Sequence, residues 1–462
     1  MPPDNPTSLW TLLKAAGDWS SRGVEGARAS ATWGELAASR VFGDQGIKRR
    51  GSSLLLAMAD QFTAAAALIE LDGKARRIVL YPSDMPREYL AMVADSAAVD
   101  VILTDQPDLK SIDSRVEHIV SHSDKTGEAD RGTQIETEWI LLTSGTSGVP
   151  KLVVHTLASL TAAIEYRSSC SSSTTWSTFY DIHRFGGLQI FLRAALTGTS
   201  LVLKGAHEWT SDFLVRAGSR GVTHISGTPS HWRRALMSPL ANRIAPAYVR
   251  LSGEIADQAI LNQLRSQYPG ATIAHAFAST EAGLAFEVND GLMGVPAELI
   301  GQDPLVEMKL KDGTLRVRSD RTASGYLGTD GPTLKDAEGY VDTGDILELR
   351  DARYYFLGRR DGIINVGGLK VHPEEVEAVI NRHPEVSGSL VRRKQNPITG
   401  ALVVADVVLK TPHLTNDGAQ ALQRDIMQFC RGELALHKVP VAINFVPTLA
   451  VSEAGKLLRP HA

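Results

Sequence analysis

Short apolar runs alternate with amphipathic segments through the first part of the chain, and this alternation limits the folds open to it. Residues 54–57, 77–81 and 99–104 are rich in aliphatic side chains and predict strands. Residues 61–71 and 87–97 have the length and spacing of helices. Strands that alternate with helices predict an α/β fold, in which a parallel or mixed sheet carries helices on its faces.

The segments on either side extend this pattern. Apolar residues recur at helical spacing over residues 10–39, which favours helix there. Residues 222–226 predict a further strand, and Pro229 is expected to open a helix. Over residues 287–350 the chain changes to short polar–apolar segments with many glycines, which indicates a small antiparallel β-unit.

A second domain is predicted toward the carboxyl end. The polar, glycine-bearing stretch 359–362 marks a boundary, so we expect domains at 1–358 and 359–462. The expected fold class is α/β: a large N-terminal domain of mixed sheets with flanking helices plus the small β-unit, followed by a small α+β C-terminal domain. The elements predicted in the second domain are a helix at 373–382, a strand at 402–409 and a helix at 416–434.

Composition argues against several functional classes. The chain has 462 residues, of which 43% are hydrophobic, and a net charge of −4, so nothing favours a nucleic-acid partner. Cys170 and Cys430 lie far apart in sequence and offer neither a disulfide framework nor a zinc-binding spacing. The N-terminus has no basic region followed by an apolar core, which argues against a signal peptide. The apolar segments 53–59 and 62–71 fall short of the roughly 20 residues of a membrane helix, so we expect no membrane span and a cytoplasmic enzyme.

Residues 141–151 predict a phosphate-binding loop. Gly145 and Gly148 permit backbone conformations that turn amides toward an anion. The side chains that can add hydroxyl donors or a positive charge are Thr143, Ser144, Thr146, Ser147 and Lys151. The loop is not a Walker loop, because Pro150 and Leu152 stand where that motif needs a glycine and a hydroxyl. A surface loop rich in serine and glycine is the alternative.

Five stretches in order along the chain resemble one known family, the AMP-forming acyl- and aryl-CoA synthetases, with the carrier-loading adenylation domains and the luciferases. The loop is similar to that family's T-S-G-[ST]-[TS]-G-x-P-K-G signature and departs from it at Leu152. The other matching stretches are residues 277–281, 340–345, 358–361 with 367–377, and 453–456. A single match would be weak evidence, whereas five in the family's order make a chance resemblance improbable.

The resemblance implies a two-step activation of a carboxylic acid. Acid and ATP would give an acyl-adenylate and pyrophosphate, and the thiol of coenzyme A would then displace AMP. In such an enzyme the loop holds the β- and γ-phosphates, Glu281 binds Mg²⁺, and Thr280 beside it contacts the phosphates. Without the resemblance, Thr280 and Glu281 would also suit a helix N-cap and its acidic first turn.

The resemblance also implies contacts with the nucleoside. Phe277 would lie against the adenine, where the family has tyrosine, and Asp345 would accept both ribose hydroxyls. Arg359 would assist from the other side. Core burial is the alternative for Phe277, and a turn and a solvated arginine are the alternatives for Asp345 and Arg359.

Three further features resemble the family's C-terminal machinery. Lys456 matches its catalytic lysine, whose ammonium group can bridge the incoming carboxylate and the α-phosphate. Gly367 and Gly368 match the loop that closes over the pantetheine arm of the thiol substrate. Asp361 falls where the family hinges its mobile C-terminal domain. A solvated tail lysine and a tight β-turn are the alternatives for Lys456 and for the glycine pair.

A histidine segment resembles the wall of the family's acyl pocket. His183 matches the histidine of its P-x-x-H-x-x-G motif, although the proline is absent, and a structural histidine is the alternative. Arg184 argues against an α-amino acid and could either pair with a second acidic group or point to solvent. The other substrate-binding candidates are Phe185, Gly253, Ala276, Ala278 and Leu284. Their small or apolar side chains suit a benzoate-like or short acyl group.

Several alternatives stay open at this point. A separate acyl-carrier protein could replace coenzyme A as the acceptor, and a luciferase-like oxidation is more distant. A catalytically inactive relative that binds nucleotide is supported by Leu152, by Ala278 in place of the family's glycine, and by a short N-terminal region. The expected cofactors and partners are ATP, Mg²⁺, coenzyme A and a small carboxylic acid, and a homodimer stays open.

Overall fold

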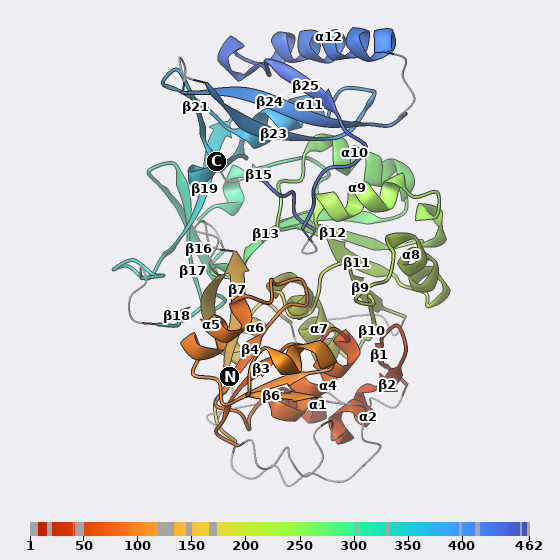
Figure 1. Cartoon of the computed structure of the whole chain (residues 1–462), viewed down its shortest axis with the longest axis vertical. Coiled ribbons are helices and arrows are strands. Elements are labelled where there is room, and N and C mark those ends of the chain that lie inside the picture. Colours follow the sequence, from red (N-terminus) through yellow and green to blue (C-terminus); the bar gives the residue numbers. More distant parts are fainter. Residues whose placement is uncertain are drawn as a thin grey trace.

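A computed structural model describes residues 8–15, 21–39, 41, 50–118, 134–144, 150–165, 173–301, 303–328, 333–396, 400–411, 416–452 and 455–459. Figure 1 shows a large N-terminal domain, coloured red through teal, and a small blue C-terminal domain at one end of it. The large domain contains two sheets of seven and eight strands and a five-stranded sheet beside them. This arrangement confirms the predicted α/β fold class.

The seven-stranded sheet has the order β18-β8-β7-β4-β3-β5-β6. Its strands are β3 (Ser53–Leu56), β4 (Arg77–Leu80), β5 (Val101–Thr104), β6 (Val116–His118), β7 (Glu138–Ser144), β8 (Pro150–His155) and β18 (Gly325–Tyr326). The strands from β3 to β7 run parallel, whereas β8 is antiparallel to β7 and β18 is antiparallel to β8. Strand β18, which comes late in the chain, therefore forms the edge of this sheet beside β8, the strand that follows the phosphate loop.

The eight-stranded sheet has the order β14-β13-β12-β11-β9-β10-β1-β2. Its strands are β1 (Gly23–Glu25), β2 (Ser30–Thr32), β9 (Thr175–Thr178), β10 (Ser200–Leu203), β11 (His224–Gly227), β12 (Tyr248–Ser252), β13 (Thr272–Ser279) and β14 (Gly283–Val288). The six central strands are parallel, and the edge strands β2 and β14 are antiparallel to their neighbours.

Helices fill the space between the two sheets and cover their outer faces. Side chains of α4 (Gln61–Leu71) and α7 (Phe185–Thr197) share one buried cluster with both sheets. On the outer faces, α5 (Tyr89–Ser96) packs on the seven-stranded sheet, and α8 (Thr210–Ser219), α9 (Pro229–Met237) and α10 (Gln258–Gln267) pack on the eight-stranded sheet. The shorter pieces are α6 (Leu157–Thr161), η1 (Pro107–Ser111) and η2 (Ala241–Arg243).

Helix α4 explains how the two sheets come close enough to share a core. All eleven of its residues are buried, and four of them form the run Ala64 to Ala67. Small side chains there let the sheets approach from both sides, while Phe62 fills the space at the start of the helix. Asp60 caps the helix by accepting from Thr63 N at 3.1 Å. Replacing Phe62 with alanine is expected to cost about 3–5 kcal/mol of stability.

The five-stranded sheet is the small antiparallel unit expected over residues 287–350. It has the order β15-β20-β19-β17-β16, and every pairing in it is antiparallel. Its strands are β15 (Val295–Pro296), β16 (Val306–Lys311), β17 (Thr314–Ser319), β19 (Val341–Arg350) and β20 (Arg353–Arg359), and η3 (Ala297–Leu299) follows β15.

The small C-terminal domain has its own buried core around Val376, Val391 and Ile426, and it includes the buried Cys430. Its elements are η4 (Arg360–Gly362), β21 (Ile364–Val366), β22 (Leu369–Val371), α11 (Pro373–Ile380), β23 (Val386–Asn396), β24 (Gly400–Leu409), α12 (Asn416–Glu433), η5 (Leu436–Lys438) and β25 (Ala442–Phe445). Cys170 lies outside the described residues.

The expectation of helix over residues 10–39 is only partly correct. The structure has α1 (Leu9–Ala15) and α2 (Trp33–Ala38), with the short strands β1 and β2 between them. Strand β1 forms because Val24 pairs with Leu201, a partner far away in sequence that leaves no local pattern. Thr32 starts α2 through a capping box with Glu35, which separates it from the strand before it.

Candidate active site

The candidate residues gather at one edge of the eight-stranded sheet. Strands β9, β11, β12 and β13 are parallel, so their carboxyl ends lie on the same side. The segments that follow these ends are residues 179–184, 228–231, 253–254 and 280–281. Ligands of open α/β sheets bind outside the carboxyl ends of the strands. In Figure 1 the dark blue end of the chain descends from the small domain to this edge.

Thr280 and Glu281 occupy a tight turn between β13 and β14. The alternative in which they start a helix is therefore wrong. Glu281 accepts a hydrogen bond from Thr143 Oγ1, at the end of β7, at 3.4 Å. It also accepts from the hydroxyl of Tyr326, and burial and this carboxylate together raise the pKa of Tyr326 to about 12. The turn thus places a half-buried carboxylate next to the start of the phosphate loop.

The two strands that flank the phosphate loop bring its ends together. Thr143 and Ser144 on β7 pair with Lys151 and Pro150 on β8. Lys151 Nζ lies 5.2 Å from the centre of the Tyr326 ring, a cation–π distance. Tyr326 therefore contacts both the lysine of the loop and Glu281. The predicted loop residues Gly145, Thr146, Ser147 and Gly148 lie outside the described residues.

His155 fixes the turn that carries Glu281. Its Nε2 donates to the carbonyl oxygen of Thr280 at 2.7 Å, and its Nδ1 lies 2.9 Å from Ser159 Oγ. Burial lowers the pKa of His155 to about 4, so the ring is neutral at neutral pH. Since Nε2 donates its only proton, the neutral ring accepts at Nδ1. The strand after the phosphate loop is thereby tied to the acidic turn.

Phe277 belongs to a cluster of three phenylalanines. Its ring centre lies 5.7 Å from that of Phe286 and 5.3 Å from that of Phe356, in stacked orientations. The side chain stays half-buried, so part of the ring is still accessible at the sheet edge. Ala278 faces Leu284 across β13 and β14 just after a β-bulge. Ala276, two residues before Ala278, is buried.

Asp345 and Arg359 are cross-strand partners on β19 and β20. Burial raises the pKa of Asp345 to about 6, although Arg359, Thr343 and Lys456 favour its ionised form. The Nε of Arg359 donates to Asp361 at 3.3 Å, and this guanidinium is more than half exposed. Asp345 is not in a free turn, since it is a half-buried residue of β19 next to Gly344, whose φ is +72°.

Lys456 reaches the same sheet edge from the end of the chain. A Cβ built on Gly253 would lie 3.3 Å from its Cε, so the absence of a side chain at Gly253 leaves the space beside which Lys456 lies. Desolvation by the surrounding protein lowers the pKa of Lys456, and the positive charges of Arg184 and Arg359 lower it further. The negative charges of Glu254 and Glu281 raise it. The lysine keeps solvent access, which moderates these effects. Lys456 is exposed, but its charge interacts with those of Glu254, Glu281 and Asp345, so it is not remote from the other candidates.

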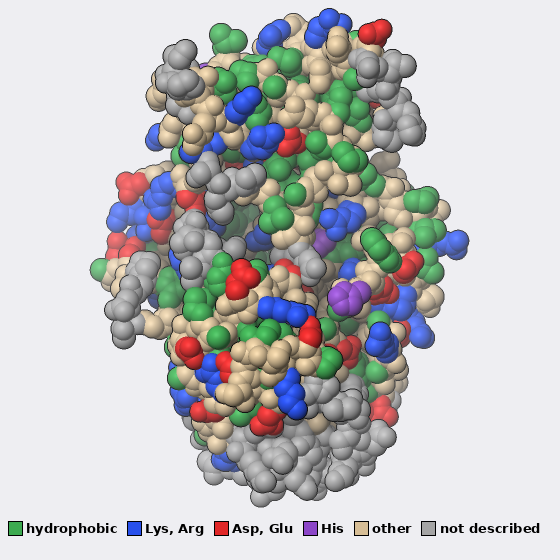
Figure 2. Space-filling view, viewed as in Figure 1, with side chains coloured by type: hydrophobic (Ala, Val, Ile, Leu, Met, Phe, Trp, Pro, Cys, Tyr) green, Lys and Arg blue, Asp and Glu red, His purple; other side chains and the backbone are tan. Residues whose placement is uncertain are grey.

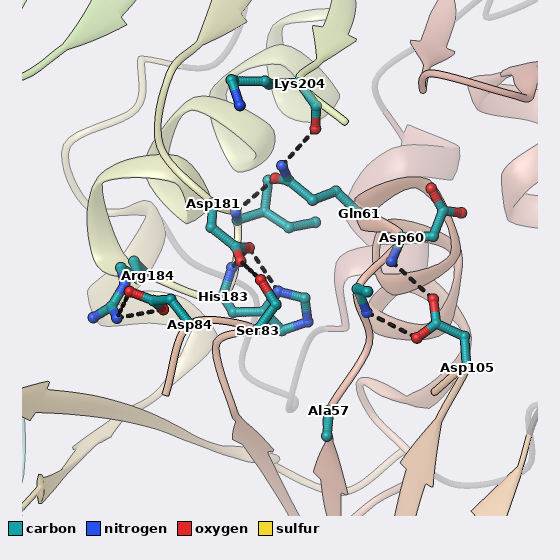
Figure 3. A network of polar contacts seen from close by, with 12 residues as sticks. Ala57, Asp60, Gln61, Ser83, Asp84, Asp105, Asp181, His183, Arg184 and Lys204 are labelled. Atoms are coloured by element: carbon teal, nitrogen blue, oxygen red, sulfur yellow. Dashed lines mark hydrogen bonds and ion pairs between the residues drawn. The ribbon is translucent and has the colours of Figure 1, made fainter. Parts of the chain in front are cut away.

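The predicted acyl-pocket histidine is part of a buried polar network (Figure 3). The Nδ1 of His183 lies 2.7 Å from Asp181 Oδ1, and Asp181 also accepts from Ser83 at 3.4 Å. Arg184 does not point to solvent, because its Nη2 lies 2.5 Å from both carboxylate oxygens of Asp84. Neither His183 Nε2 nor Arg184 Nε has a hydrogen-bond partner in the described part of the chain. Both are buried atoms near the carboxyl end of β9.

The remaining candidates lie in different surroundings. Phe185 is buried at the start of α7, where its ring centre lies 5.8 Å from that of His155. Gly367 and Gly368 form the tip of the β21–β22 hairpin with φ of +59° and +87°, a conformation that favours glycine. A Cβ added to either glycine would meet no atom within 4 Å, so this tip is open. Asp361 lies in η4, directly after the five-stranded sheet.

Sequence reasoning missed four residues that hold these groups in place: Asp84, His155, Glu254 and Tyr326. Glu254 follows the end of β12, so the rule for parallel sheets could have drawn attention to it. His155 and Tyr326 act through neighbours distant in sequence, and no local pattern reveals such contacts.

Two structural features are absent from the described residues. Within the described residues, no group of three or more His, Cys, Asp and Glu side chains is arranged to hold a metal ion. No described helix combines the length and the apolarity needed to cross a membrane. Figure 2 shows basic and acidic side chains interspersed over the visible face of the large domain.

Comparisons with known proteins agree with this fold. The sequence profile of the AMP-binding enzyme family matches residues 63–341, and that of the AMP-binding enzyme C-terminal domain matches residues 375–456. A 2-succinylbenzoate–CoA ligase from Bacillus cereus is 26% identical over 440 residues, which cover 89% of this chain and 88% of that protein. A mitochondrial acyl-coenzyme A synthetase from Homo sapiens is 25% identical over 451 residues, covering 92% of this chain and 76% of that protein.

A solved structure has the same fold. The crystal structure of an anthranilate CoA ligase in complex with anthranoyl-AMP has a TM-score of 0.83 and 18% sequence identity, with 98% of this chain and 96% of that chain covered. The first family profile alone spans more than half of the 462 residues. The chain therefore belongs to the AMP-binding enzyme family.

Proposed function

We propose that this protein is an AMP-forming carboxylic acid–CoA ligase. In the first half-reaction a carboxylate oxygen of the acid bonds to the α-phosphorus of ATP, and pyrophosphate leaves with the electron pair of the broken bond. In the second, the thiol sulfur of coenzyme A bonds to the acyl carbon, AMP leaves, and the thiol proton passes to solvent. The observation that carries this proposal is the convergence of Lys456 and Glu281 at the carboxyl edge of β13, where the charge of Lys456 also interacts with those of Asp345 and Arg359.

Lys456 is the proposed catalytic cation of the first half-reaction. Two anions, the carboxylate and the α-phosphate, must be brought into contact, and their repulsion opposes the step. An ammonium group between them offsets that repulsion and stabilises the charge that develops during transfer. The position of Lys456 beside Gly253 supports this role, because a larger residue there would compete with the lysine for space.

The ATP site is proposed to extend from the phosphate loop to β19. Lys151 and the loop hydroxyls would bind the β- and γ-phosphates, and Thr280 would contact them from the turn. Asp345 would accept the ribose hydroxyls, with Arg359 opposite it on β20. The accessible part of the Phe277 ring would lie against the adenine.

Mg²⁺ fits the donor set at Glu281. In nucleotide sites this ion takes one or two carboxylates and fills its other positions with phosphate oxygens and water. Glu281 supplies one carboxylate beside the phosphate loop, held by Thr143 and Tyr326. When bound, the ion would neutralise phosphate charge, while the chain's own part is to hold Glu281 in a fixed place.

Coenzyme A is the proposed thiol acceptor. The named relatives are CoA ligases or a coenzyme A synthetase, which favours coenzyme A over a separate carrier protein. The open glycine tip at Gly367 and Gly368 can approach a thin pantetheine arm without steric conflict. We place the hinge of the second domain at Asp361, just after β20, and its boundary at 358/359.

A compact aromatic acid is the proposed substrate class. Two similar proteins act on aryl acids, 2-succinylbenzoate and anthranilate. Ala278 and Leu284 are the proposed pocket wall, and the small or apolar side chains of these two residues suit a flat ring. His183 and Arg184 are proposed to lie beside this wall. Because Asp84 already neutralises Arg184, a second carboxylate on the acid is not required to balance its charge.

Pyrophosphate release tests the proposal. The purified protein is incubated with Mg-ATP and a panel of benzoate, 2-aminobenzoate, 2-succinylbenzoate and short aliphatic acids, and thioester formation is then followed after coenzyme A is added. We expect pyrophosphate release that depends on the acid, is strongest with an aryl acid, and is followed by consumption of coenzyme A. Absence of release with every acid would contradict the proposal and favour a ligand-binding relative without catalysis.

A further inference from the structure

The chain ends in a hairpin that carries Lys456 away from the small domain. Val451 and Leu457 form a β-bridge at its base. Below the bridge, Arg459 donates to both carboxylate oxygens of Glu377 on α11, each at 2.8 Å. The base of the hairpin is therefore anchored to the C-terminal domain.

The tip of the same hairpin is held by the large domain. Thr228, after β11, donates its hydroxyl to the carbonyl oxygen of Gly455. Glu254, after β12, accepts from Leu457 N at 2.8 Å. The two bonds flank Lys456 on either side, and both go to the backbone of the hairpin.

The carboxylate of Glu254 is itself held in place by a second hydrogen bond within the large domain. Its second oxygen accepts from Ser230 N, in the first turn of α9, at 2.9 Å. This bond from the first turn of α9 orients the Glu254 carboxylate toward the hairpin. Glu254 raises the pKa of Lys456 more than the other nearby carboxylate, Glu281, does.

Close packing around Gly455 restricts the positions that the hairpin tip can take. Gly455 has a φ of +72°, and a Cβ built on it would lie 1.9 Å from the ring of His231. His231 is buried and its ring stacks on that of Phe179 at 5.5 Å, so it cannot easily move aside. The tip can therefore occupy only a narrow range of positions, and these fix the backbone of Lys456.

We propose that Thr228 and Glu254 are positioning residues that hold the Lys456 hairpin in the geometry of the adenylation step. They act on the backbone on both sides of the lysine, so they place its ammonium group without touching the reacting atoms. The inference rests on the proposed function, in which Lys456 serves the first half-reaction. Loss of Glu254 should therefore impair acyl-adenylate formation and leave the thiol step largely unaffected.

The experiment compares Glu254→Ala and the isosteric Glu254→Gln with the native protein in three assays. The first is pyrophosphate release from acid and ATP, and the second is conversion of supplied acyl-adenylate and coenzyme A into thioester. The third needs no catalysis: it measures how fast trypsin, cutting after Lys456, releases residues 457–462, as detected by mass spectrometry. Arg459 is followed by Pro460 and resists trypsin, so this peptide reports opening of the hairpin tip.

We expect Glu254→Ala to lower pyrophosphate release by about tenfold or more, as for loss of a hydrogen bond to a charged group. Thioester formation should stay within about twofold of the native rate, and release of residues 457–462 should be at least about fivefold faster. The control is Asn381→Ala, which breaks a different contact between the domains, the 2.9 Å bond from Asn381 Nδ2 to Asp257. It should leave all three readouts within about twofold of native values.

Release of residues 457–462 at the native rate in both Glu254 variants would overturn the inference. Equal loss of both half-reactions at an unchanged melting temperature would also overturn it. If Glu254→Ala fails to fold, the test uses Glu254→Gln instead. The amide NH2 group of the glutamine is a donor, and it would face a backbone N–H, which is also a donor. If the native protein releases no pyrophosphate with any acid, the proposed function fails, and the trypsin assay still decides whether Glu254 holds the hairpin.

Discussion

The Nε2 of His155 donates to the carbonyl oxygen of Thr280 at 2.7 Å, which joins the strand after the phosphate loop to the turn that carries Glu281. The bond is partly buried, and the ring that makes it is neutral at neutral pH because burial lowers the pKa of His155 to about 4. The strand after the predicted phosphate loop is therefore joined directly to the turn that carries Glu281. A change at His155 should act on adenylation without touching the acid.

His155→Phe keeps a ring in place but leaves the Thr280 carbonyl without its donor. Thr280 is half-buried, and a buried carbonyl without a donor costs about 1–3 kcal/mol at most, so we expect the turn to shift and pyrophosphate release to fall about tenfold. The KM for the acid should change little. Ser159→Ala is the matched control: it removes the 2.9 Å contact on the other side of the ring and the Ser159 hydroxyl's bonds to Thr156, but it leaves the bond to Thr280, so its effect should be much milder. Native pyrophosphate release by His155→Phe would show that this bond does not position Glu281.

Asp345 should make nucleotide binding depend on pH. Its pKa is raised to about 6 by burial, and only the carboxylate can accept both ribose hydroxyls. As pH falls through about 6 the ionised fraction falls, so binding should weaken, by up to about tenfold per pH unit well below that value. Calorimetry with an acyl-adenylate analogue whose own charge is constant measures this directly. Asp345→Asn should bind weakly at all pH values, and an identical slope in that variant would assign the titration to another group.

Gly455 and His231 should show strong coupling. Gly455→Ala adds a methyl group that collides with the His231 ring and also strains a φ of +72°, so adenylation should fall about tenfold or more. Adding His231→Ala removes the ring and should restore part of the rate, with a coupling energy of about 0.5–3 kcal/mol in a double-mutant cycle. Pyrophosphate release and melting temperature of all four proteins complete the cycle. Additive effects would mean that the tip does not pack on His231 during catalysis.

Ala278→Gly tests the wall of the acyl pocket. Ala278 faces Leu284 at the end of β13, and removing its methyl group should enlarge the space there. We expect the ratio of kcat/KM for bulky over compact acids to rise by about tenfold, the value of one or two methylene groups in an apolar pocket. The control is Ala274→Gly, on the same strand but fully buried and not among the substrate-binding candidates. An unchanged order of preference across the acid panel would remove Ala278 from the pocket wall.

Most of the fold could be predicted from local patterns. The buried strands β3, β4 and β5 read as continuous aliphatic runs, and α4 has the length of a helix between them. Strands β1 and β18 could not be predicted, because each is at most three residues long and is defined by a partner far away in the chain. The order of strands within the sheets likewise depends on these distant pairings.

The prediction of the family from the motifs is confirmed, whereas the roles of individual site residues stay predictions. Motifs identify groups such as Glu281 and Lys456 because the residue type itself carries chemistry. They do not identify Glu254 or Tyr326, whose importance comes only from what the fold brings next to them. The Arg184–Asp84 pair was also beyond prediction, since its partners lie on loops of different sheets.

The most direct test of the whole account is the separation of the two half-reactions in Lys456→Ala. Loss of one preorganised charge-stabilising group should lower pyrophosphate release by about 10²-fold or more. The same variant should still convert supplied acyl-adenylate and coenzyme A into thioester at near the native rate, because the ammonium group is needed only where the carboxylate meets the α-phosphate. Near-native pyrophosphate release by Lys456→Ala would contradict the central assignment.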